Sequence, residues 1–288
     1  MPNTAASNER LFCWEQVQAT NPLFRISRVF APAGQAERLL PLYALFAALE
    51  QLCSRRSALD VGRRTLDWWR SECRPGNIER SGHPILRELT RAGACMALDR
   101  DALARLFDTV EARFDAAAPA DLEGLGRLCR FVAEPQYDLE LGLCAGPSSC
   151  ERQAPTACAS NGLTQLIRES VGSGRAGCYW SLPLNLLARH SVSRSDVGEH
   201  ADAPAVRAMF EDILGHAQGW DAMPGEQREH ARIVQASMRH YVVFSHLQSC
   251  ILRRLRGSRP AQYPAVLKRA GAAELLQAWK AARLVSRP

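Results

Sequence analysis

Two segments of the chain contain the side chains best suited to chemistry. Arginines lie in both, with Arg55 and Arg56 in the first segment and Arg168 and Arg175 in the second. A guanidinium group binds phosphate oxygens through paired hydrogen bonds and needs no metal ion to do so. The second segment adds an amide, a carboxylate and a phenol, which are Gln165, Glu169 and Tyr179. If the two segments face each other, these residues would line a phosphate site.

The first of these segments ends a long predicted helix. Apolar side chains recur there at steps of three and four residues, at Leu39, Leu42, Tyr43, Phe46, Leu49 and Leu52. This spacing places them on one face of a helix. Arg55 and Arg56 are adjacent, so they lie about 100° apart around a helix axis. We therefore expect at most one of them, represented in the predicted site by Arg56, to point inward.

The same two segments carry a family resemblance. Residues 44–57 read Ala-Leu-Phe-Ala-Ala-Leu-Glu-Gln-Leu-Cys-Ser-Arg-Arg-Ser, and residues 162–173 read Gly-Leu-Thr-Gln-Leu-Ile-Arg-Glu-Ser-Val-Gly-Ser. They resemble the squalene/phytoene synthase signatures Ala-Leu-Tyr-Ala-Phe-Cys-Arg-Glu-Ile-Asp-Asp-x-x-Asp and Gln-Leu-Thr-Asn-Ile-Leu-Arg-Asp-x-x-x-Asp. The resemblance extends roughly from Phe24 to Arg256. It implies an all-α fold, a single helical bundle of the isoprenoid (prenyl) synthase type.

Most aspartates of those signatures are absent from this chain. Cys53, Ser54 and Ser57 replace them in the first signature and Ser173 in the second, while Glu169 is a conservative change. In the family, aspartates on facing helices hold Mg²⁺ ions that bridge to a diphosphate. Magnesium prefers carboxylate and other oxygen ligands, and a thiol suits softer metals. Without Mg²⁺ the leaving diphosphate loses its main electrostatic stabiliser, so we expect no metal and no cofactor.

Three functional hypotheses follow from the resemblance. Within the family the chain is most similar to the non-catalytic branch that includes the mitochondrial complex I assembly factor, through Phe46–Leu52 and Arg168–Ser170. The preferred hypothesis is therefore a scaffold or assembly factor with a protein partner, for example a respiratory complex. The second is an active prenyltransferase that condenses prenyl diphosphates with Mg²⁺ in isoprenoid biosynthesis. The third is a metal-free protein that binds a prenyl phosphate through its arginines.

Simpler structural roles are predicted for several individual residues. We expect Glu169 to pair with an arginine, Cys53 to pack in the core, and Trp68 and Trp69 to pack in the core and at its rim. Tyr179 either lines a cavity, as the matching family tyrosine does, or caps the turn before the next helix. Glu134 and Asp138 are spaced as an acid pair on a helix, but the second motif offers no matching partner, so a displaced metal site is disfavoured.

The rest of the chain has helical periodicity and no strand alternation. A helix is predicted after Asp99 or Asp101, either of which could cap it, and another over 121–145, which Pro135 should kink or break. His83-Pro84 predicts a helix start. Residues 1–20 are predicted to be a loose segment, and residues 21–288 one helical domain.

Composition and charge limit the kinds of molecule that the protein is expected to bind. The formal net charge is +6, and basic residues concentrate near the C-terminus at Arg253, Arg254, Arg256 and Arg259. They are predicted either to be solvated or to contact a prenyl lipid, an acidic membrane surface or an acidic protein. No nucleic-acid motif accompanies the charge. The ten cysteines form no CxxC pair, and no secretory signal or membrane-spanning run is recognisable. We expect a cytoplasmic protein, peripheral to the inner membrane if the basic cluster binds lipid.

Overall fold

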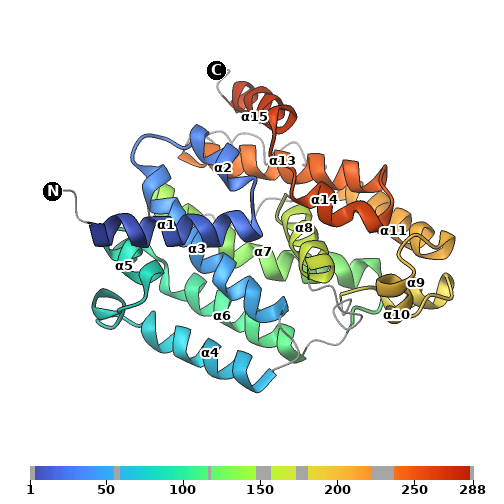
Figure 1. Ribbon diagram of the computed structural model, residues 1–288, viewed down its shortest axis with the longest axis horizontal. Coiled ribbons are helices and arrows are strands. Elements are labelled where there is room, and N and C mark those ends of the chain that lie inside the picture. Colours follow the sequence, from blue (N-terminus) through green and yellow to red (C-terminus); the bar gives the residue numbers. More distant parts are fainter. Residues whose placement is uncertain are drawn as a thin grey trace.

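The computed structural model describes residues 4–54, 59–115, 118–146, 157–172, 181–221 and 237–285. Within these residues the regular structure is entirely helical, which confirms the all-α prediction (Figure 1). The α-helices are α1 (Thr4–Thr20), α2 (Phe24–Ser27), α3 (Gln35–Ser54), α4 (Leu59–Glu72), α5 (Pro84–Arg91), α6 (Arg100–Asp115), α7 (Leu122–Ala145), α8 (Ala157–Gly172), α9 (Leu184–Arg189), α10 (Arg194–Glu199), α11 (Pro204–Ala217), α13 (Arg239–Arg256), α14 (Tyr263–Leu267) and α15 (Ala272–Val285). Short 3₁₀ turns occupy Arg28–Phe30, Ile78–Arg80, Cys95–Ala97, Gln218–Asp221 and Pro260–Gln262.

Helix α3 lies at the centre of the bundle. It packs against α1, α5, α6, α7 and α8, and its residues 39–47 are all buried. A helix that is apolar around its whole circumference is stable only when other helices enclose it. The position of α3 therefore follows from its sequence, and its last two turns carry the first candidate segment into the interior.

One sequence prediction was wrong, and another was wrong in part. Residues 4–20 form α1, which packs on α3 and α5 and buries Cys13 and Val17, so the segment is not loose over this part. Pro135 does not break its helix, because α7 continues through it to Ala145, and the kink at Pro135 stays a prediction. A proline removes one hydrogen bond of a helix, and tertiary packing compensates for that loss here, since Pro135 is itself buried.

The predicted helix starts are confirmed in detail. His83 accepts a hydrogen bond from the Ile85 backbone N–H at 3.3 Å, and Pro84 is the first residue of α5. The Asp99 carboxylate accepts from the Ala102 N–H at 2.9 Å, so Asp99 caps α6. Trp69 is buried against the His83 ring while Trp68 is exposed beside it, which confirms their predicted positions in the core and at its rim.

Helices α7 and α8 approach each other closely at Gly162. A Cβ atom added there would lie 2.0 Å from the backbone oxygen of Cys129 on α7. Contacts this short do not exist in proteins, so any larger residue would push the two helices apart. This packing fixes the distance across which side chains of α7 and α8 meet.

We predict that Gly162→Ala destabilises the protein by roughly 1–3 kcal/mol or more, because one added methyl group cannot be accommodated without moving a helix. Urea denaturation measures the change. Gly82→Ala is the matched control, since a Cβ at Gly82 meets nothing within 4 Å. Equal stability of the two variants would contradict the close approach.

Candidate functional site

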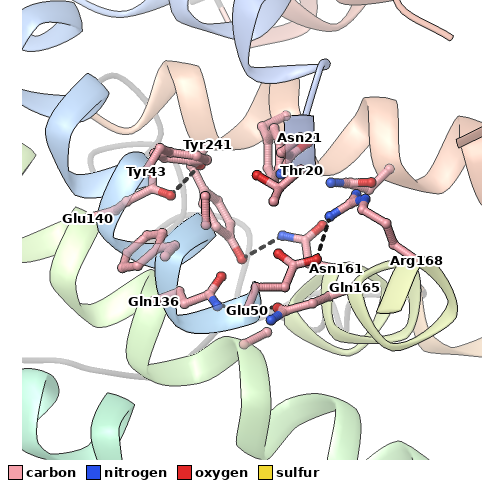
Figure 2. Close-up of a pocket in the computed structure, with 15 residues that line it drawn as sticks. Thr20, Asn21, Tyr43, Glu50, Gln136, Glu140, Asn161, Gln165, Arg168 and Tyr241 are labelled. Carbon is pink, nitrogen blue, oxygen red and sulfur yellow. Dashed lines mark hydrogen bonds and ion pairs between the residues drawn. The ribbon is translucent and has the colours of Figure 1, made fainter. Parts of the chain in front are cut away.

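Four helices and the end of a fifth enclose a pocket in the middle of the bundle. Its empty volume, including its open mouth, is about 510 Å³. The lining comes from α1, α3, α7, α8 and α13, with Asn21 following α1 (Figure 2). The lining residues are Thr20, Asn21, Tyr43, Phe46, Ala47, Glu50, Ala133, Gln136, Glu140, Asn161, Gln165, Arg168, Tyr241, Phe244 and Gln248.

The pocket walls combine polar groups with apolar surface. Eleven of the fifteen lining residues have a polar group in the side chain, whereas Phe46, Ala47, Ala133 and Phe244 are apolar. More of the exposed wall is apolar than polar. A ligand in this pocket would therefore meet both hydrogen-bonding groups and apolar surface.

An ion pair joins the two candidate segments across the pocket. Nη1 of Arg168 on α8 lies 3.4 Å from Oε1 of Glu50 on α3, and both side chains are largely buried (Figure 2). Burial raises the pKa of Glu50 to about 7, against the opposing effect of Arg168. The positive charge of Arg168 is therefore already directed at a carboxylate of the protein.

A second ion pair lies beside the first. Arg113 of α6 binds Glu169 of α8, and Arg113 is only 5% exposed. Burial lowers the pKa of Arg113, but its interactions with Cys53 and Glu169 outweigh burial and raise that pKa above its ordinary value. Gln165 donates to Glu169 from Nε2 over 3.3 Å and accepts from Gln136 over 3.2 Å. The expectation that Glu169 pairs with an arginine is confirmed.

Within the described residues, the side chains near the two motifs are poor ligands for Mg²⁺. Among the residues that the structure describes, no group of three or more His, Cys, Asp or Glu side chains could hold a metal ion. The carboxylates nearest the two motifs, Glu50 and Glu169, are each bound by an arginine. The Arg113 guanidinium is a fixed cation that interacts electrostatically with Cys53, where the first motif would have an aspartate. A magnesium ion would therefore meet an existing positive charge and too few oxygen ligands.

A buried acid forms a separate cluster in the same pocket. Tyr43 donates a hydrogen bond of 2.5 Å to Oε1 of Glu140, and Nε2 of His240 lies 3.1 Å from the Tyr43 hydroxyl. Burial raises the pKa of Glu140 to about 8, although the Tyr43 hydrogen bond opposes this shift, and burial lowers the pKa of His240 to about 4. At neutral pH the cluster is therefore held mainly as a neutral acid beside a neutral imidazole.

Hydrogen bonds between α8 and α13 form another wall of the pocket. The Asn161 amide donates to the Tyr241 hydroxyl at 3.1 Å and to Ser245 Oγ at 3.0 Å. The Tyr241 hydroxyl also lies 3.1 Å from Cys158 Sγ. Four side-chain oxygens of pocket-lining residues are buried without a hydrogen-bond partner: Asn21 Oδ1, Glu140 Oε2, Asn161 Oδ1 and Gln248 Oε1.

The structure brings together only part of the predicted site. Gln165 and Arg168 of α8 line the pocket, Glu169 follows Arg168 on the same helix, and Cys53 is buried near the end of α3, as expected. Ser54 is the last residue of α3, and its side chain is not described. The remaining predicted positions lie outside the described residues; they are Arg56, Ser57, Ser173, Arg175 and Tyr179. Asp138 is paired with Arg105 at 2.7 Å.

Several site residues were missed by the sequence analysis. Arg113, Glu140 and His240 lie far from both motifs in the chain. For Glu140 a signal existed, because it is a lone carboxylate within the apolar run Leu139–Leu143 of a predicted helix. Such a residue is buried whichever way the helix turns, and a buried carboxylate needs a partner.

We predict a change in pH dependence for Glu140→Gln. The folded protein keeps the Glu140 proton up to about pH 8, whereas the unfolded chain releases it near the ordinary value. Unfolding therefore releases a proton, and this one group lowers stability by up to about 1.4 kcal/mol per pH unit as the pH rises. His240 contributes equally to the wild type and the variant, so it does not affect their difference. Between pH 6.5 and 8 the variant should lose less stability than the wild type.

Urea denaturation at both pH values measures this difference. Glu123→Gln on the same helix is the control, because Glu123 is exposed and paired only with Arg127. A wild-type slope in the Glu140 variant would show that the acid is ionised in the folded protein.

The comparisons with known proteins agree with this fold. The sequence model of the squalene/phytoene synthase family matches residues 20–270. A dehydrosqualene synthase crystallised with ligand superposes with a TM-score of 0.68 at 15% identity, covering 99% of this chain and 98% of its own. Squalene synthase HpnC from Alicyclobacillus acidocaldarius gives a TM-score of 0.60 at 16% identity, covering 88% and 95%. No curated protein matches. The match over most of its length places this chain in the squalene/phytoene synthase family.

Proposed function

We propose that this member of the squalene/phytoene synthase family has lost Mg²⁺-dependent prenyl transfer and acts as a scaffold or assembly factor. The supporting observation is that arginines neutralise the two carboxylates at the motifs. Arg113 on α6 binds Glu169 on α8, and Arg168 on α8 binds Glu50 on α3.

The electrostatics explain the proposed loss. Ionising a prenyl diphosphate creates a diphosphate leaving group, and metal ions stabilise its charge. Carboxylates must hold those ions, but each carboxylate at the motifs here already has a guanidinium partner. Residues 55–58 and 173–180, which complete the two motifs, contain no Asp or Glu in the sequence. The chain therefore lacks the ligands that would bring magnesium to a diphosphate.

A structural role is evident for the residues that resemble the complex I assembly branch. Glu50 lies in the first of those segments and Arg168 in the second, and the two form an ion pair that links α3 to α8. Truncating one member would leave a buried charge without a partner, which is strongly destabilising. The pair thus has a use that requires no substrate. A respiratory complex is the first protein partner to examine.

Metal-free binding of a prenyl phosphate is the alternative outcome. Arg168 would have to leave Glu50, or bind the phosphate through its Nε, which has no protein partner. Such binding would be equal with Mg²⁺ and with EDTA, and Arg168→Ala would abolish it. The proposed scaffold has neither property.

We predict no release of inorganic diphosphate when the purified protein is incubated with farnesyl or geranylgeranyl diphosphate, with Mg²⁺ or with EDTA. A dehydrosqualene synthase assayed in parallel shows that the substrates are competent. Magnesium-dependent release above the buffer blank would establish a working prenyltransferase and overturn the proposal. Release that is lost in an Arg113→Ala variant would further assign catalysis to this site.

A scaffold also has to have a partner. Affinity purification of the tagged protein after mild cross-linking in its native cell should recover respiratory membrane proteins at a constant ratio. A tagged Gly82→Ala protein serves as a folded replicate, since this change meets no neighbouring atom. Recovery of the bait alone from both strains would count against an assembly role.

A further inference from the structure

In the last described helix, α15, the large apolar side chains are exposed to solvent instead of packing against the core. Its buried residues toward α13 include Ala278, Ala281 and Ala282. Its exposed residues include Leu275 and Leu276, each 51% exposed, and Trp279, which is 44% exposed. A surface helix normally directs its largest apolar side chains inward. Here the small side chains face the protein and the large ones face solvent.

The exposed residues form one continuous surface. At about 100° per residue, Leu275, Trp279, Arg283, Leu276 and Lys280 follow one another around an arc of about 140°. These five residues are called the α15 outer face below. It contains three large apolar and two basic side chains and no acid. The Arg283 guanidinium lies 3.5 Å from the centre of the Trp279 ring, so charge and apolar surface are in direct contact.

The positive net charge of the protein is concentrated near the C-terminus. Residues 253–285 contain eight basic residues and one acidic residue, a net charge of +7, whereas the whole chain has +6. The one acid, Glu274, is buried and bound to Arg254, which joins the end of α13 to the start of α15. Arg253, Arg256 and Arg259 are exposed. Figure 1 shows α15 on the outside of the bundle, beyond α13.

We propose that the α15 outer face docks on an anionic lipid surface, with the helix lying in the plane of the interface. Helices that bind in this way combine Trp and Leu with Lys and Arg on one exposed surface. The basic side chains reach the headgroups while their stems and the Trp ring contact the acyl boundary. No helix in the described residues is long and apolar enough to span a membrane, so the attachment is peripheral.

The shape of the surface favours lipid over an acidic protein. The apolar side chains project outward from a single helix packed on α13, and the pocket described above lies elsewhere in the protein. A protein partner would need a matching hollow, whereas a lipid interface adapts to a projecting helix. The excess of positive charge selects anionic headgroups by long-range attraction.

Sedimentation with sucrose-loaded vesicles tests the proposal on the full chain. We expect binding to phosphatidylcholine vesicles that contain phosphatidylglycerol, and much weaker binding to phosphatidylcholine alone. Replacing Leu275, Leu276 and Trp279 together with Ser should weaken binding at least about tenfold. Lys280→Glu and Arg283→Glu should each weaken it by about fivefold or more, and added salt should weaken it further.

Matched controls distinguish binding through the α15 outer face from non-specific adsorption to vesicles. Replacing Leu11, Val61 and Met96 with Ser removes three exposed apolar side chains from other elements, and Arg64→Glu with Arg100→Glu removes exposed charge elsewhere. These variants should bind as the wild type does. The proposal is wrong if the wild type does not sediment with anionic vesicles, if neutral vesicles bind equally, or if the controls lose as much binding as the α15 variants. Circular dichroism confirms that each variant is folded.

Discussion

The enclosure of α3 is the constraint on which the rest of this structure depends. Other helices surround it, so its polar side chains must find partners inside the protein rather than in water. Tyr43 binds Glu140 on α7, and Glu50 binds Arg168 on α8. Gln51 donates a hydrogen bond from Nε2 to Gln16 Oε1 on α1 over 3.0 Å. These contacts orient three neighbouring helices around one axis.

The same constraint determines the electrostatics of the pocket. An unpaired charge buried there would cost several kcal/mol, and the buried cations Arg113 and Arg168 are each matched by a carboxylate. Arg113 with Glu169 and Arg168 with Glu50 leave little net charge for a diphosphate or for magnesium. Glu140 differs because none of its hydrogen bonds is to a cation, and it avoids the cost by remaining protonated to about pH 8. The polar interior is thus stabilised without any ligand.

Local sequence patterns predicted those structural features that depend on residues close together in the chain. Helix periodicity, the His83-Pro84 start, the Asp99 cap and the arginine partner of Glu169 all follow from spacing and residue type. Which residues would be their partners could not be predicted, because Arg113, Glu140 and His240 come from helices distant in the chain. Helix α1 was missed since its start is polar and its stabilisation comes from burial of Cys13 and Val17 against α3 and α5. The break predicted at Pro135 does not occur, because the packing of the 24-residue helix α7 outweighs the low helix propensity of one proline.

The pocket and the α15 outer face differ in what a ligand would have to displace. In the pocket, Arg168 is paired with Glu50, so a substrate that bound the Arg168 Nη1 atom would first have to break this ion pair. On α15, Leu275, Leu276 and Trp279 are exposed to water and can be covered without breaking an ion pair. Burial of such side chains is favourable in proportion to their area, and the nearby basic side chains favour an anionic surface.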